Sequence, residues 1–316
     1  MSGFLTRRVV SLFVTLLVTS ILVFVIMDLL PGDSASIMLG TSASPDTLAA
    51  LQRELGLDQP LLWRYVRWVG GVIHGDLGTS YTYGVPVAGL IADRLAVTLP
   101  LAIMAIVISV VIAVPLGVQA ARSHRGPVDL VIGLFTYVGV AIPAFWLGLL
   151  LILLFSNQLG WLSAGGFPGW AAGPGPALSA LLLPAVALAL PQAAVLTRVT
   201  RSAVLETLNE DFVRTARAKG LGEAAATWRH ALPAALVPVL TVLGLQSTFL
   251  VAGAVLVENV FNLPGLGRLA FQALSQRDIV VMQDVVLFFA AMVIVMNFLV
   301  DIAYLFLDPR LRMQRT

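Results

Sequence analysis

The sequence has no cysteine among its 316 residues, and only 11% of its residues are charged. Without cysteine, the chain cannot form disulfides, thiolate metal sites or a cysteine nucleophile, and nothing follows about its redox compartment. A soluble domain typically carries about 25% charged residues, so a soluble protein of this size would lack the charge that its surface needs. The net charge of +2 is too small to indicate nucleic acid as a partner.

In place of charge, the sequence has long apolar runs. A helix needs about 20 apolar residues to cross the hydrocarbon core of a membrane. Six stretches qualify, and we expect them near 9–30, 96–120, 129–156, 178–197, 235–257 and 285–307. The first follows two arginines, as in a signal peptide, but its apolar core exceeds the usual length of about 7–15 residues, which favours a membrane span.

Prolines occur in or near most of these stretches, at Pro115, Pro143, Pro184, Pro191 and Pro238. Membrane helices tolerate proline when neighbouring helices, side chains or water satisfy the freed carbonyl groups. We therefore expect kinked helices that pack in a bundle.

The fold class predicted from these patterns is an all-α integral membrane protein with six transmembrane helices. Six spans put both termini on one side, and with the termini inside, thirteen of the 19 lysines and arginines fall in inner segments. The positive-inside rule then places both termini in the cytoplasm. The expected organisation is a cytoplasmic N-terminus and first span at 1–30, an extracytoplasmic segment at 31–95, a five-helix core with an inner loop at 198–233 over 96–307, and a cytoplasmic tail at 308–316.

The segment 31–95 is too long for a simple connector and should be partly helical. Ser44 can cap a helix with Pro45 in its first position, and Gly56 can close it. A second, amphipathic helix is expected from Asp58, with Pro60 in its first turn. This helix could lie on the membrane surface or form a docking platform for an extracytoplasmic partner, and the two roles are compatible.

Catalytic and metal-binding patterns are missing from the sequence. There is no G-x-S-x-G nucleophile motif, and the three histidines, on two sides of the membrane, cannot form one metal site. A P-loop requires a lysine after a glycine, whereas the only lysine, Lys219, precedes Gly220. We therefore expect no enzymatic activity, no metal and no cofactor on this chain. If ATP powers transport, the ATPase is another polypeptide.

The most charged inner stretch is RTARAKGLGEAAATWRHALP, at 214–233. Its composition predicts a helix, a break at Gly220 and Gly222, and a second short helix, because glycine allows the positive φ of a sharp turn between helices. It could be an ordinary inner loop whose charge only satisfies topology, but its length and pattern favour a compact knob.

This stretch resembles the motif of ABC importer permeases, usually written E-A-A-x3-G-x9-I-x-L-P. Arg214, Thr215 and Ala216 take the E-A-A places, and Gly220 is the motif glycine. His230 replaces the isoleucine, and the leucine and proline are Leu232 and Pro233. The spacing matches throughout, with Arg, Thr and His as departures from the pattern.

The form RTARAKGL, followed by TWRHALPAALVP, is similar to the oligopeptide and dipeptide branch of these permeases. The resemblance covers nearly the whole chain. It includes FLTRRVVSLFVTLL, LPGD at 30–33, LGLDQPLLWRYVRW, GDLGTSYTYGVPV, VLVENVFNLPGLGRLAFQAL, RDIVVMQD and DPRLR.

The resemblance implies the type I ABC importer permease fold in a bacterial inner membrane. It also implies a homologous second permease, two ATPase subunits that hold ATP and magnesium, and an extracytoplasmic binding protein that delivers di- or oligopeptides. The loop at 205–233 would be the coupling element that docks in a groove on an ATPase. Its coupling residues would be Arg214, Thr215, Ala216, Arg217, Lys219, Gly220, Leu221, Leu232 and Pro233.

Four polar residues within the spans are candidates for the pathway or its gate. Asn297 and Asp301 lie four apart, hence on one helix face. An intramembrane carboxylate usually faces a bundle interior or a water-filled cavity, although Asp301 could instead pair with an inner arginine in a structural role. Gln192 and Gln246 could contact substrate, but helix–helix hydrogen bonding is the commoner use of such residues.

Two alternatives to peptide import are open from the sequence. Relatives in this branch carry nickel chelates, glutathione or other small solutes through the same architecture. A self-contained channel or ion-driven carrier would belong to another class, and it should have an inverted repeat and charged groups at the bilayer midplane. The sequence has neither.

Overall fold

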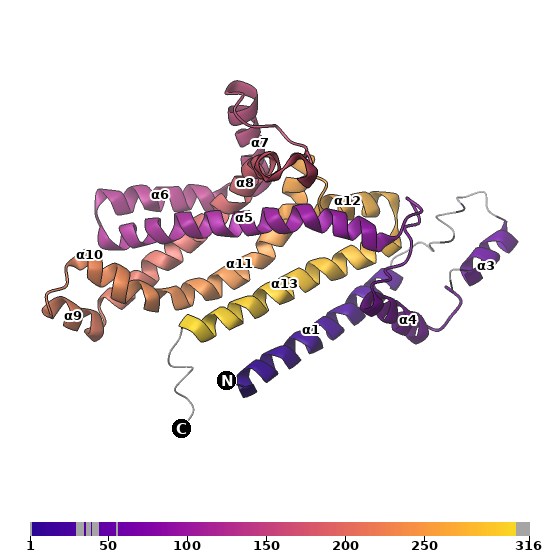
Figure 1. Cartoon of the computed structure of the whole chain (residues 1–316), viewed down its shortest axis with the longest axis horizontal. Coiled ribbons are helices and arrows are strands. Elements are labelled where there is room, and N and C mark those ends of the chain that lie inside the picture. The colour runs from indigo at the N-terminus through magenta and orange to yellow at the C-terminus, as the bar shows by residue number, and fades with distance from the viewer. Residues whose placement is uncertain (1, 30–34, 36–38, 40–43, 55, 308–316) are drawn as a thin grey trace. The chain divides into compact units, whose positions relative to one another are not determined.

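The computed structural model describes residues 2–29, 35, 39, 44–54 and 56–307. Within these ranges the chain is almost entirely helical (Figure 1), and its only β-bridge joins Thr79 and Pro86. The LPGD stretch and the predicted tail at 308–316 lie outside the described residues. The chain divides into two compact units: Met1–Arg8, Leu99–Leu263 and Val295–Thr316 form one, and Val9–Thr98 and Pro264–Ile294 form the other.

Among the described residues, five helices are long and apolar enough to cross a membrane. They are α1 (Ser2–Leu29), α5 (Val87–Arg122), α8 (Pro174–Leu208), α11 (Leu232–Val260, entered through the short helices that precede it) and α13 (Ile279–Leu307). A sixth span is complete only if α6 (Pro127–Ala141) is counted together with α7 (Ala144–Leu151) and the π-helix η1 (Ile152–Gln158).

The prediction of one continuous, kinked third span is wrong. The two halves of the pair meet at an angle of 105°. Ile142 has extended backbone angles, as a residue before proline prefers, and Pro143 caps α7 from outside the helix. Pro115, Pro184, Pro191 and Pro238 lie inside continuous helices, and a kink at these four positions stays a prediction.

In the first unit, α8 lies at the centre and packs against α6, α7 and α11. Small residues allow the helices to approach closely, as is common in membrane bundles. A Cβ atom on Gly139 of α6 would lie 2.7 Å from the Cβ of Ala194, and one on Gly117 of α5 would lie 2.5 Å from the Cβ of Thr200. Both distances are below van der Waals contact, so these positions require glycine.

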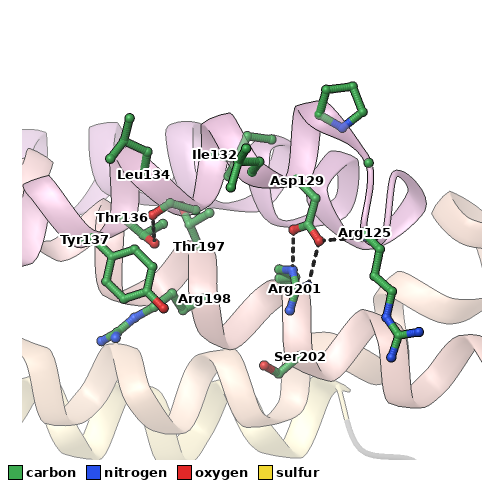
Figure 2. Close-up of a pocket in the computed structure, with 14 residues that line it drawn as sticks. Arg125, Asp129, Ile132, Leu134, Thr136, Tyr137, Thr197, Arg198, Arg201 and Ser202 are labelled. Atoms are coloured by element: carbon green, nitrogen blue, oxygen red, sulfur yellow. Dashed lines mark hydrogen bonds and ion pairs between the residues drawn. The ribbon is translucent and has the colours of Figure 1, made fainter.

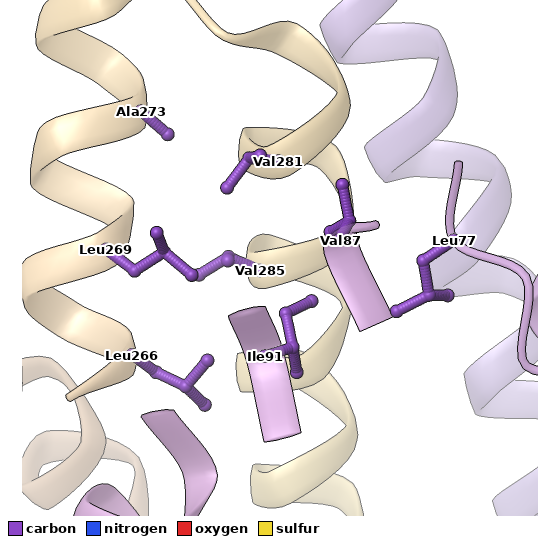
Figure 3. Close-up of a cluster of buried hydrophobic side chains, with 8 residues drawn as sticks. All are labelled: Leu77, Val87, Ile91, Leu266, Leu269, Ala273, Val281 and Val285. Carbon is purple, nitrogen blue, oxygen red and sulfur yellow. The ribbon is translucent and has the colours of Figure 1, made fainter. Parts of the chain in front are cut away.

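The second unit has a core built from segments far apart in the sequence (Figure 3). Its buried side chains come from the loop after α4 (Leu61–His74), from α5, from α12 (Leu266–Gln276) and from α13; they are Leu77, Val87, Ile91, Leu266, Leu269, Ala273, Val281 and Val285. The buried Asp278 closes this unit by accepting hydrogen bonds from Ser80 Oγ at 2.5 Å and from the Thr82 backbone N–H at 3.0 Å.

The segment after α1 contains the two predicted helices. The first, α3 (Pro45–Glu54), is capped by Ser44, whose Oγ accepts from the Thr47 N–H at 3.2 Å, and Gly56 follows it with φ +68°. Helix α4 begins at Leu61, three residues later than predicted, with Pro60 as its N-cap. A helix beginning at residue 58 would have to pass through the residue before Pro60, where proline disfavours helical angles.

Candidate functional site

The motif stretch folds into two short helices joined by a tight turn, as predicted. Helix α9 (Asp211–Ala218) is followed by the turn, by α10 (Glu223–Ala226) and by the π-helix η3 (Thr227–Ala231), which leads into α11. We call residues 211–231 the knob. A buried cluster of Val213, Ala226 and Ala231, joined by Leu208, holds its helices together. The knob is therefore a small packed body and not a loose loop.

Only one of the two glycines in the turn has a positive φ. Gly220 has φ +91°, and the Leu221 N–H closes the turn onto the Ala216 carbonyl at 3.2 Å. A Cβ atom on Gly220 would meet nothing within 4 Å, so the requirement for glycine is one of backbone conformation alone. Gly222 has φ −63°, and the expectation of positive φ there is wrong.

The coupling residues named from the motif fall into an exposed and a buried set. Arg214, Thr215, Arg217, Lys219 and Gly220 are exposed, and Leu221 is half-buried. Ala216 is buried within the knob, and Leu232 is buried among residues of α5 and α8, with Pro233 next to it in the first turn of α11. The motif thus supplies both a charged outer surface and the anchorage of the knob to the bundle.

The ion pairing of the knob is weak. Arg214 Nη1 lies 3.5 Å from Asp211 Oδ1, and both side chains are largely exposed. Two aromatic side chains that the sequence reading did not single out also reach solvent: Phe212 of α9 is 46% exposed and Trp228 of η3 is 43% exposed. A packed body with exposed cations and aromatic rings has the composition of a protein-binding surface.

Asp301 of α13 forms an ion pair with Arg8 of α1, at 2.8 Å between Oδ2 and Nη1. This is the pairing that the structural interpretation of Asp301 expects. Asn297, one turn earlier, lies beside α11, because a Cβ atom on Gly244 would be 3.3 Å from Asn297 Oδ1. A role of either residue in the pathway stays a prediction.

Gln192 and Gln246 come together although they lie on different helices. Both line a small cavity in the first unit between α5, α8 and α11, which is completed by Ile106, Ser109, Leu243, Ser247 and Leu250. Gln192 Oε1 is buried without a hydrogen-bond partner in the described residues. A buried amide oxygen of this kind can accept a hydrogen bond from a water or from a side chain that shifts toward it. The cavity is therefore a polar site within an otherwise apolar helix contact.

The sequence reading missed an ion-pair cluster between α6 and α8 (Figure 2). Asp129, in the first turn of α6, accepts from Arg201 Nε at 2.6 Å and from Arg201 Nη2 at 2.7 Å. The Arg125 backbone N–H donates to Asp129 at 3.0 Å, and Arg201 also donates to His124 Nδ1 at 3.2 Å. The signal in the sequence is an acidic residue two positions after Pro127, in the first turn of a helix.

No group of three or more potential metal ligands occurs among the described residues. The three histidines are exposed, and His74 and His124 lie in different compact units.

Replacing Asp301 should test which of its two roles applies. Because the ion pair with Arg8 is partly exposed, we expect Asp301→Asn to destabilise the complex by up to about 1 kcal/mol, seen as a small decrease in melting temperature with uptake retained. Arg8→Gln is the matched control and should produce the same decrease, since it removes the same pair. Slow uptake with an unchanged melting temperature in Asp301→Asn alone would instead indicate a pathway role.

Comparison with known proteins identifies the chain. Residues 113–313 match the family model described as binding-protein-dependent transport system inner membrane component, and residues 1–102 match the model of its N-terminal part. A putative peptide transport system permease protein from Brucella abortus (strain 2308) is 41% identical over 312 residues, which cover 99% of each chain. A probable peptide ABC transporter permease protein from Sinorhizobium fredii is 38% identical, over 99% of this chain and 100% of that one.

A glutathione transport system permease protein from Salmonella paratyphi A is also 38% identical, over 99% of both chains. Among solved structures, an amino acid ABC transporter crystallised with histidines has a TM-score of 0.51 and 21% identity, over 68% of this chain and 92% of that one, which shows likeness of fold. These matches confirm the resemblance drawn from the motif. This multi-pass membrane protein belongs to the family of binding-protein-dependent transport system inner membrane components, the permease subunits of ABC transporters.

Proposed function

We propose that this chain is one half of the translocation pathway of an ATP-driven peptide importer, and that it acts with a second, homologous permease. The observation that carries the proposal is the knob: a packed, exposed body that bears the permease motif around Gly220 and is joined to a bundle of membrane helices. Its packing lets it move as one piece, so that a displacement of the knob is passed on to α8 and α11.

The energy source lies on other subunits in this proposal. Two ATPase subunits or domains bind ATP and magnesium, and each receives one knob in a surface groove. ATP binding draws the two ATPases together and swings the knobs, so that the spans open outward and accept substrate from an extracytoplasmic binding protein. Hydrolysis returns the spans to the inward-open state. The cationic surface of the knob suits a groove with acidic residues at its rim.

The orientation follows from charge. With both termini and the knob in the cytoplasm of a bacterium, thirteen of the 19 lysines and arginines face inward. Residues 31–95 then lie outside the inner membrane, within reach of the binding protein. In this segment α4 holds Tyr65 against Ser20 and Phe24 of α1 and leaves a second apolar face exposed, with Leu62, Trp63, Val66 and Ile73. That exposed face could rest on the membrane surface or contact the binding protein.

The substrate class is inferred from the relatives. Those named for peptide transport are 38–41% identical over almost the whole chain, which supports di- or oligopeptides. Glutathione is the second candidate, because a relative named for it is 38% identical over an equal share. Both are short chains of amino acids with a free carboxylate.

Co-expression of the chain with its partner subunits should test the proposal. We expect purification to yield one copy of this chain, one different permease and two ATPase domains, while the chain alone is unstable or inactive, because a single half would leave its part of the pathway facing lipid. In proteoliposomes, loaded binding protein should stimulate ATP hydrolysis and peptide uptake, and mass spectrometry of the binding protein's ligand should identify the cargo. Uptake by a homodimer without a second permease would contradict the proposal.

A further inference from the structure

A groove with a volume of about 640 Å³ lies between α6 and α8, in the first compact unit (Figure 2). The groove has two kinds of wall. Charged and hydroxyl-bearing side chains come from α8, from the turn before α6 and from α6 itself, and the apolar side chains come from α6. Among the lining residues are Arg125, Asp129, Tyr137, Arg198, Arg201 and Ser202.

The charges in this groove do not balance. Asp129 accepts hydrogen bonds from Nε and Nη2 of Arg201 and from the Arg125 backbone N–H, so both of its carboxylate oxygens are engaged. The guanidinium groups of Arg125 and Arg198 are exposed, and no carboxylate in the described residues forms an ion pair with either. Among the residues that line the groove, Asp129 is the one carboxylate. The groove therefore carries an excess of positive charge and attracts an anion.

The apolar wall indicates where the anion comes from. Helix α6 is part of the bent pair that is apolar enough to enter a membrane. Its side chains Leu130 and Tyr137 are 76% and 71% exposed, so they are free to contact lipid. Leu134 is exposed between them, and Gly133 leaves an open gap, because a Cβ atom there would meet nothing within 4 Å. A water-soluble anion would gain nothing from this surface, whereas an acyl chain would bury it.

We propose that the groove binds an anionic phospholipid. Its phosphate is held by the Arg198 guanidinium, whose planar fork suits a phosphate in bidentate geometry, and Ser202 lies one turn further along α8. The Arg125 guanidinium adds positive charge at the opposite end of the groove (Figure 2). One acyl chain lies along α6 over Leu130, Gly133 and Leu134. Tyr137 has the amphipathic ring that favours the membrane interface. Basic pockets between membrane helices are suited to anionic headgroups.

The same geometry selects against zwitterionic lipids. A choline or ethanolamine ammonium group would need a free carboxylate, but Asp129 is engaged with Arg201. Phosphatidylglycerol carries the same phosphate charge with a neutral headgroup, so it needs no carboxylate partner and keeps its net negative charge for the arginines. This inference does not depend on the identity of the transported substrate or on the knob.

The test uses the complete transporter in nanodiscs of phosphatidylglycerol and phosphatidylcholine, followed by detergent extraction and native mass spectrometry of the retained lipid. We expect the wild type to retain phosphatidylglycerol preferentially. Arg198→Gln should reduce this retention about fivefold, as expected for the loss of one cation near a membrane surface, and Arg198→Lys should restore part of it. Arg122→Gln is the matched control, since Arg122 is exposed at the end of α5 and does not line the groove.

A second variant tests the groove without changing its charge. A Cβ atom at Gly133 meets nothing within 4 Å, so Gly133→Phe should fold, and its ring should fill the gap and reduce retention of phosphatidylglycerol. Inorganic phosphate at about 10 mM, where charge–charge interactions are only weakly screened, should leave the lipid in place. Displacement of the lipid by phosphate, or equal retention of both lipids by the wild type and Arg198→Gln, would overturn the proposal.

Because the chain has no cysteine, Leu134→Cys provides a single attachment point for a thiol-reactive photo-crosslinker. We expect its adducts to be phospholipid. A cross-link to the second permease in place of lipid would assign this face to the contact between subunits and would also overturn the proposal.

Discussion

Replacing Gly220 with valine should abolish transport while the chain still reaches the membrane and assembles. At φ +91°, a β-branched side chain encounters its own backbone at a cost of about 1–3 kcal/mol. No neighbouring atom contributes to this cost, since the space around Gly220 is open. The turn should relax to a negative φ and change the direction of α10, which begins three residues later. ATP hydrolysis should then no longer rise when loaded binding protein is added.

Gly222→Val is the matched control for this experiment. Gly222 also has open space around it, but its backbone is extended, with φ −63° and ψ 155°, which valine adopts readily. We expect near-normal transport from this variant. Arg217→Ala should likewise have a small effect, because an exposed ion pair at a groove rim contributes under about 1 kcal/mol. Normal transport by Gly220→Val combined with loss of transport in Arg217→Ala would show that the knob acts through charge and not through its shape.

Truncating Trp228 should weaken the association of the permease with its ATPase at least 30-fold. Exposed aromatic residues at the centre of an interface commonly contribute about 2 kcal/mol or more. Trp228 belongs to η3, which packs against α9, and the buried core beneath it fixes its position. Phe212→Ala should have a similar but smaller effect, because a phenyl ring buries less area than an indole. The measurement is the binding of purified ATPase to the reconstituted permease pair.

Trp161→Ala provides the comparison, because Trp161 is 69% exposed but lies outside the knob, in the loop between η1 and η2 (Trp170–Ala172). It should leave the association with the ATPase unchanged. Equal effects of the two tryptophan variants would indicate a general loss of stability and would remove Trp228 as an anchor.

Features that depend on a few neighbouring residues could be predicted from the sequence. The membrane spans follow from runs of apolar residues, and the cap at Ser44 and the turn at Gly56 follow from local hydrogen bonding and backbone freedom. The break at Gly220 follows from the backbone freedom of glycine, and the position of the knob follows from the spacing of the motif. Helix α4 starts three residues later than the sequence pattern predicts, because Pro60 disfavours helical angles in the residue before it.

Local sequence does not predict whether a proline breaks a helix in this chain. Pro143 ends one helix and starts another at an angle of 105°, whereas Pro115 and Pro191 lie inside unbroken helices. All three follow apolar residues, so their immediate surroundings in the sequence do not distinguish them. The outcome depends on whether packing favours a continuous helix or a change of direction, and only the tertiary structure decides that.

Pairing between charged and polar residues was also decided by the tertiary structure. Asp129 and Arg201 are 72 residues apart, and Ser80 and Asp278 are 198 apart. The sequence identified Asp301 as costly in a membrane but could not select Arg8 as its partner. By itself, the sequence determined the membrane spans and the turn at Gly220, because apolar length and backbone freedom are local properties, and its resemblance to a family motif indicated a permease. Which charges meet, and where a groove remains open between α6 and α8, depended on the three-dimensional packing of helices that are distant along the chain.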